Sequence, residues 1–159
     1  MKNCRIILIE LFLKAIHMNA ISMNEENLIL KVETRPALGE LVKHVSELGT
    51  RFVFVDNRNF PDGKLYVIAR VVENVKEPYE SAEPRAHTVD AVMIFMGLRS
   101  DLKGLKVQVM LNDRWFTLES PAAVYVPAHT RHTYRILEGS GIYMKIVLAP
   151  HGDYNAVTY

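Results

Sequence analysis

Four side chains that can bind ions lie in two short stretches of the second half of this 159-residue chain. Arg85 and His87 lie two residues apart in the stretch RAHTVDAVMIFMG, and His129 and His132 lie in the stretch SPAAVYVPAHTRH. Neutral imidazoles are common ligands of transition metals, whereas a guanidinium binds carboxylates and phosphates through paired hydrogen bonds. The sequence therefore offers two chemistries in one place, a metal site and an anion site.

The two stretches resemble the two sequence motifs of the cupin superfamily. The first motif of that family is HxH, followed at set spacings by a glutamate and a glycine, and the second motif is PxGxxH. The residues of this chain that match the pattern are His87, Gly97, Pro127 and His132. The resemblance implies an antiparallel β-barrel, the double-stranded β-helix of that family, in which His87 and His132 face the barrel interior.

Three positions depart from the family pattern. Arg85 stands in place of the first histidine, Ala91 in place of the glutamate, and His129 in place of the glycine. Without the carboxylate, His87 and His132 form a thin metal site, because catalytic sites usually hold a metal ion with three or more protein ligands. His129 is a candidate third imidazole, since histidine tolerates positive φ better than most residues; alternatively it points to solvent.

Asp90 is a second candidate for the missing carboxylate. It lies three residues from His87, and side chains at that separation on a strand point to opposite faces. Only a β-bulge would turn the Asp90 side chain inward.

Arg85 is the departure that favours a different ligand. A permanently charged guanidinium would repel a divalent cation and attract a carboxylate or a phosphate. Arg131 and Tyr134 are the further candidate ligand-binding residues beside it in this hypothesis. The alternative is that Arg85 lies at the rim of the barrel and pairs with Glu83 or Asp90.

Strands are predicted to carry these residues from about residue 50 onward. Segments such as RFVFV, LYVIARVV, VMIFMGL, LKVQVML and IYMKIVLA are rich in β-branched and aromatic residues and are separated by turn residues. Many short strands at this spacing favour an antiparallel sandwich or barrel. We therefore predict a mostly-β protein, with an N-terminal extension and helix over residues 1–50 and a cupin-like β-barrel over residues 51–159.

The predicted N-terminal helix covers residues 38–48. Apolar residues recur there at helical spacing, Pro36 suits the first turn, and Gly49 suits the end of the helix. The apolar stripe is expected to pack on the barrel, so Leu41→Asp would destabilise the protein strongly by burying an unpaired charge. His44 lies on the polar side and is expected to be a solvated surface residue.

Charge and cysteine content limit the kinds of binding partner and the cellular compartment that we expect. The 19 basic and 18 acidic residues give a formal net charge of +1, which offers no electrostatic reason to expect nucleic acid or a membrane surface as a partner. Cys4 is the single cysteine, so no internal disulfide forms, which fits the cytoplasm.

The apolar segment IILIELFLKAI is too short to span a bilayer. We expect it to pack on the domain or on a second subunit, and the cupin resemblance implies a homodimer.

Three functions are compatible with these residues. The first is a barrel protein that binds a small anionic metabolite through Arg85 and the inward histidines, with no metal or a weakly bound divalent ion. The second is a metal-dependent enzyme, an oxygenase or isomerase, in which His87 and His132 hold the ion together with His129 or water. The third is a non-catalytic oligomeric interaction protein whose barrel is filled by side chains. The substrate cannot be identified from the sequence.

Overall fold

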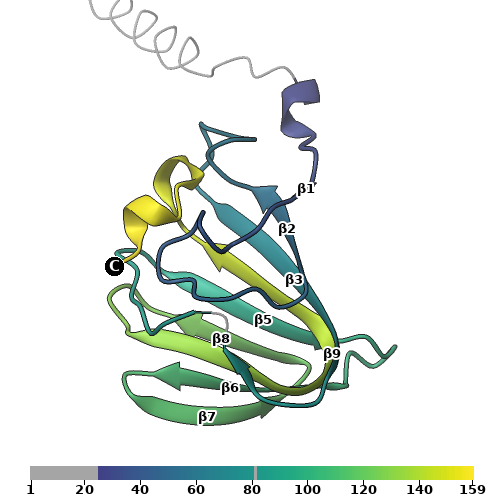
Figure 1. The fold of residues 1–159 in the computed structure, drawn as a ribbon. Helices are drawn as coiled ribbons and strands as arrows, with labels where there is room; N and C mark the ends of the chain where they lie inside the picture. Colours follow the sequence, from purple (N-terminus) through teal and green to yellow (C-terminus); the bar gives the residue numbers. More distant parts are fainter. Residues whose placement is uncertain (1–24, 81) are drawn as a thin grey trace, which may run out of the picture.

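The structure is a computed structural model that describes residues 25–80 and 82–159. Within these residues the fold is one antiparallel β-sheet with short 3₁₀ helices near its ends (Figure 1). The strands are β1 (Glu33–Thr34), β2 (Thr50–Val55), β3 (Tyr66–Val75), β4 (Tyr79–Glu80), β5 (Ala91–Gly97), β6 (Leu105–Leu111), β7 (Arg114–Glu119), β8 (Ala122–Val126) and β9 (His132–Val147). The helices are η1 (Glu25–Leu28), η2 (Pro150–Gly152) and η3 (Asn155–Val157). The mostly-β, antiparallel prediction is confirmed.

The long strand β9 joins the two halves of the sheet. Its first half pairs with β4 and β6, and its second half pairs with β3 and β5. Gly139 lies between the halves at φ +103°, where an added Cβ would be 2.0 Å from the Gly104 carbonyl oxygen, so the bend requires glycine. Tyr134 and Tyr143 lie on opposite halves, and a straight strand would hold them roughly 30 Å apart. Their ring centroids are 4.1 Å apart, so the halves face each other across a space that we call the barrel interior.

The apolar core fills part of the barrel interior from both halves of the sheet. Phe95 of β5 stacks on Tyr143 with ring centroids 5.3 Å apart and also contacts Tyr134. Buried and half-buried residues alternate strictly along β5, as expected for a strand with one face against a core. Burying a large apolar side chain contributes about 1.5–3 kcal/mol, so this shared core stabilises the closed arrangement. Its fully buried members include Met93, Phe95, Val107, Val109 and Ile136.

The helix predicted over residues 38–48 is wrong, because this segment consists of turns and irregular backbone. Gly39 at φ +81° and Lys43 at φ +63° cannot continue a right-handed helix, which needs negative φ. Leu41 packs against the core, whereas Val45 is 52% exposed. The apolar residues at helical spacing therefore do not form one buried stripe. Contacts with the barrel therefore override the local helical pattern.

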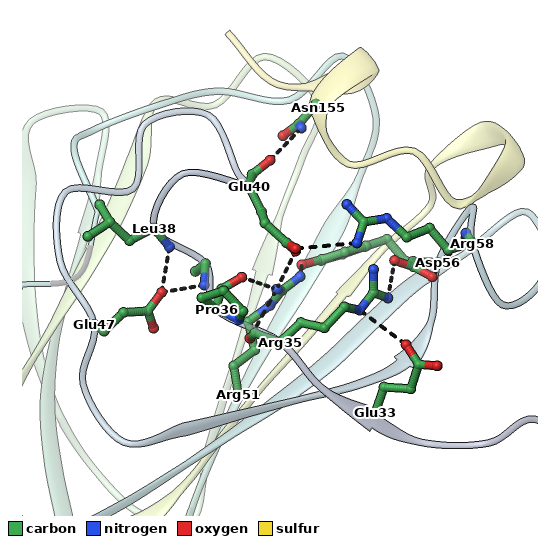
Figure 2. A network of polar contacts seen from close by, with 12 residues as sticks. Glu33, Arg35, Pro36, Leu38, Glu40, Glu47, Arg51, Asp56, Arg58 and Asn155 are labelled. Atoms are coloured by element: carbon green, nitrogen blue, oxygen red, sulfur yellow. Dashed lines mark hydrogen bonds and ion pairs between the residues drawn. The ribbon is translucent and has the colours of Figure 1, made fainter.

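Residues 35–48, which we call the cover segment, lie against the barrel instead (Figure 1). Buried Arg51 of β2 donates to the Pro36 carbonyl oxygen at 2.8 Å and lies 3.6 Å from the Glu40 carboxylate. The Glu47 carboxylate accepts a hydrogen bond of 2.5 Å from a backbone N–H of the same segment. These contacts hold the cover segment without a helix. Figure 2 shows them together with Glu33, Arg35, Asp56, Arg58 and Asn155.

Residues 150–159, which we call the C-terminal tail, return to the segment that precedes β5. Ala86 and Tyr159 exchange two backbone hydrogen bonds of 3.0 Å, and the Thr88 N–H donates to the Val157 carbonyl oxygen at 2.8 Å. The tail therefore reaches the residues of the first motif.

Two sequence predictions concern residues outside the described part of the chain. The apolar segment at residues 6–16, on which the homodimer prediction partly rested, and Cys4 both lie there. Within residues 25–80 and 82–159, no helix combines the length and apolar character needed to cross a bilayer.

Candidate functional site

Backbone pairing brings the two sequence motifs together. The Arg85 N–H donates to the His132 carbonyl oxygen at 3.0 Å, and the His132 N–H donates to the Arg85 carbonyl oxygen at 2.7 Å. The His129 N–H also donates to the His87 carbonyl oxygen at 2.6 Å. Residues 42 to 47 positions apart along the chain therefore form one site.

His87 and His132 meet inside the barrel, as the motif alignment predicts. Both side chains are fully buried, and their ring centroids are 4.8 Å apart. His87 Nδ1 lies 2.9 Å from Thr158 Oγ1, which donates its own proton to the Tyr154 carbonyl oxygen. His87 Nδ1 therefore carries the proton. Its Nε2 is left as a lone pair with no hydrogen-bond partner among the described residues.

Lys145 of β9 is hydrogen-bonded to the corresponding nitrogen of His132, Nε2. His132 Nδ1 lies 2.9 Å from the Thr130 carbonyl oxygen, which only accepts, so this nitrogen carries the proton. Its Nε2 accepts a hydrogen bond of 3.0 Å from Lys145 Nζ. Lys145 is 2% exposed. The site therefore contains an amine that sequence reasoning did not include.

Arg85 is buried rather than placed at the rim. Its Nε donates to the Tyr154 hydroxyl at 2.7 Å, and a terminal nitrogen donates to the Glu83 carbonyl oxygen at 3.2 Å. Within the described residues, neither Arg85 nor Lys145 forms an ion pair with a carboxylate. A buried charge without a partner is costly, so the site is electrostatically incomplete.

A small cavity lies beside these residues. Its volume is about 10 Å³, which is room for about one water molecule. Arg51 and Arg70 also reach it, but they are paired with carboxylates of the cover segment, Glu40 at 3.6 Å and Glu47 at 2.9 Å. The lining is thus rich in cations and phenols: Leu41, His44, Arg51, Tyr66, Ile68, Arg70, Arg85, Tyr134, Tyr143, Lys145 and Tyr154.

The buried bases are shifted toward their neutral forms. Burial, and next the charge of Arg85, hold the pKa of Lys145 well below its usual value. Burial, with Lys145 as the next cause, lowers the pKa of His132 to about 2 and also lowers the pKa of His87. Burial raises the pKa of the Tyr143 hydroxyl well above 10.0. The site therefore holds neutral imidazoles and a protonated phenol around one guanidinium, together with an amine whose protonation is disfavoured by burial and by Arg85.

These donors do not fit a divalent metal ion. Lys145 occupies His132 Nε2, so His87 Nε2 is the one unpaired imidazole nitrogen of the pair. Ala91 supplies no carboxylate, and Arg85 adds a positive charge. Within the described residues, no group of three or more His, Cys, Asp or Glu side chains could hold a metal.

Five of the candidate residues lie outside the cavity lining: the buried pair His87 and His132, and three residues farther out. His129 adopts φ +64° but is exposed, with Nδ1 3.0 Å from the Tyr159 hydroxyl. Arg131 is exposed and pairs with Asp113. Asp90 accepts a hydrogen bond of 2.8 Å from the Ala128 N–H, outside the histidine pair. The remaining two candidates, Arg85 and Tyr134, do line the cavity.

Sequence reasoning missed several residues of the site, among them Lys145 and His44. Lys145 shares the inward parity of Tyr143 and Val147 in the apolar segment IYMKIVLA, and that alternation could have identified it. His44 was predicted to be a solvated residue of a helix, which is wrong. It is half-buried at the cavity, and burial lowers its pKa to about 3.

Comparison with known proteins gives the fold. No family model matches the chain, and no curated protein matches it. A variant of oxalate decarboxylase from Bacillus subtilis is 12% identical, with a TM-score of 0.51 over 82% of this chain and 32% of that chain. A cupin superfamily protein from Desulfitobacterium hafniense is 13% identical, with a TM-score of 0.47 over 76% of this chain and 94% of that one. KdgF from Halomonas sp. is 16% identical, with a TM-score of 0.42 over 64% and 77%. The chain has a cupin fold, as the two motifs imply.

Proposed function

We propose that the barrel interior binds a small anionic metabolite, of the size of a short carboxylate, through Arg85. The observation that carries the proposal is the buried guanidinium of Arg85, which has no carboxylate partner among the described residues and lines the cavity beside the buried Lys145. An anion at the cavity would supply the missing partner. Charge-assisted hydrogen bonds from a guanidinium to a carboxylate are among the strongest in proteins.

The cover segment is the part of the site that has to move. A cavity of about 10 Å³ admits about one water, so even a two-carbon carboxylate requires Leu41 and His44 to shift outward. The cover segment lacks regular secondary structure and is held by side-chain contacts from Arg51 and Arg70. Such a segment opens at lower cost than a strand in the middle of the sheet.

No step of the proposed function passes through a metal, because the donor set does not fit one.

The proposal includes a cytoplasmic homodimer. Light scattering of the purified full chain tests the dimer independently of ligand binding.

Titration calorimetry with glycolate, acetate and phosphate tests the anion site. Replacing a charge-assisted contact costs about 1.5–3 kcal/mol, so Arg85→Gln is expected to weaken binding by roughly tenfold to a hundredfold. Arg85→Lys keeps the charge but not the two-pronged geometry, and an intermediate affinity is expected. Arg131→Gln is the matched control, because Arg131 is exposed. Equal affinities for all four proteins would refute the proposal.

A further inference from the structure

We infer that Lys145 is an amine nucleophile that forms an imine with a small 2-oxo acid bound in the barrel interior. The inference rests on the proposed anion site and names its substrate class. A 2-oxo acid has a carboxylate for Arg85 and an adjacent carbonyl carbon that an amine can attack.

The position of Lys145 is the first support. Its side chain is 2% exposed, and it lines the same cavity as Arg85. Because His132 Nε2 can only accept, Lys145 Nζ must donate one N–H to it, across 3.0 Å. This bond fixes the direction of the Lys145 side chain, and in the neutral amine the lone pair is not used by it.

The charge around Lys145 is the second support. Arg85 lies near enough to affect the amine electrostatically, and none of the ion pairs among the described residues involves Lys145. Desolvation and a neighbouring cation both favour the neutral, nucleophilic form of a lysine, and Lys145 has both in its surroundings: it is 2% exposed and lines the same cavity as Arg85. A lysine that only bound anions by charge would instead need to stay protonated.

Tyr143 supplies the third group. It lies two residues from Lys145 on the same face of β9, and it lines the cavity. Its hydroxyl is buried with no hydrogen-bond partner among the described residues. A carbonyl oxygen placed between the two side chains would accept this hydrogen bond, which polarises the carbonyl carbon toward Lys145.

The reaction balances without an oxidant or a metal. The Lys145 Nζ lone pair forms the C–N bond, and the carbonyl π electrons move to oxygen, which gains a proton to give a carbinolamine. The proton lost by nitrogen is gained by the departing oxygen, so the step takes up and releases no net proton. The C–O bond then breaks and one water leaves. The products are an imine on Lys145 and water, which together contain all atoms of the amine and the 2-oxo acid.

Reductive trapping with glyoxylate and cyanoborohydride tests the inference on the full-length protein. Reduction of the imine leaves a stable carboxymethyl group, which peptide mass spectrometry assigns to a particular lysine. At limiting glyoxylate we expect Lys145 to be modified at least tenfold faster than exposed Lys103. Glycolate, which has the carboxylate but no carbonyl group, should compete. Arg85→Gln should slow the modification of Lys145 by tenfold or more, and Arg131→Gln should not.

The outcomes separate the inference from the proposed function. If surface lysines are modified and Lys145 is not, the inference is overturned. Arg85-dependent glycolate binding would then still support the anion site, whereas absence of glycolate binding would remove both. Lys145→Met, checked for folding by its thermal transition, must lose the modification at this site and leave that of Lys103 unchanged.

Discussion

Lys145 Nζ donates a hydrogen bond of 3.0 Å to His132 Nε2 inside the barrel. A histidine that the cupin motif would assign to a metal is therefore bonded to an amine. Arg85 lies beside the same amine, without a carboxylate partner among the described residues. The residues at the positions of the two motifs therefore form a basic pocket. The proposed anion site and the proposed reactive lysine both rest on it.

Lys145→Met is predicted to stabilise the protein at pH 7. The unfolded chain binds a proton at Lys145 below pH 10.5, whereas the folded chain does not until well below that value. The contribution of Lys145 to the free energy of unfolding of the wild type therefore rises with pH from the folded-state pKa up to 10.5, and the variant lacks this contribution. We expect the variant to gain on the order of 1–4 kcal/mol at pH 7 and the difference to shrink toward pH 10.5.

Chemical denaturation of wild type and Lys145→Met at several pH values measures this difference. Exposed Lys103 provides the control, and Lys103→Met should change the free energy of unfolding by less than about 0.5 kcal/mol. A large loss of stability in Lys145→Met would mean that Lys145 is a structural partner of His132.

Acid is predicted to destabilise the protein through His44 and His132. Both have folded-state pKa values far below 6.5, about 3 and about 2. Between those values and pH 6.5 the unfolded chain binds more protons, so the free energy of unfolding falls as pH falls. Each histidine contributes up to about 1.4 kcal/mol per pH unit. Urea denaturation should show a shallower slope below pH 6.5 in His44→Asn, with exposed His129→Asn behaving as wild type.

The cover segment is predicted to be stabilised by Leu41 and not by an apolar helix face. Leu41 packs against the core, whereas Leu38 is 50% exposed. Leu41→Ala should therefore cost about 1–2 kcal/mol, less than a fully buried leucine, and Leu38→Ala should stay within about 0.5 kcal/mol of wild type. Equal losses in thermal unfolding would favour a packed helical stripe instead.

Metal binding is predicted to need the removal of Lys145. The family pattern alone is restored by Arg85→His with Ala91→Glu, but Lys145 still occupies His132 Nε2. Adding Lys145→Met frees that nitrogen, and cobalt titration followed by absorbance should show affinity at least roughly tenfold higher in the triple variant than in the double variant. Similar affinities would indicate that Lys145 does not compete with a metal for His132.

The strands and the histidine pair could be predicted from the sequence because their signals are local. Alternation of apolar residues identified strands such as β5, and the two motifs placed His87 and His132 on facing strands. The same alternation in β9 predicts that the Lys145 side chain points into the barrel. Lysine is almost never fully buried unless paired, however, so the residue type favours a surface position.

The cover segment could not be predicted, because its conformation depends on long-range contacts. The Glu47 carboxylate accepts a hydrogen bond from the Leu38 N–H, and Arg51 donates to the Pro36 carbonyl oxygen. The helical period of residues 38–48 contains no information about these partners. The contact of Thr158 with His87 is also invisible in the sequence, since 71 positions separate the two residues.

A crystal structure of the protein grown with glycolate tests the central claim most directly. The account predicts the carboxylate at the guanidinium of Arg85 inside the barrel, within hydrogen-bonding distance (about 2.7–3.2 Å), with Leu41 and His44 displaced outward. Glycolate seen at exposed Arg131 alone, with the interior cavity still closed, would contradict it.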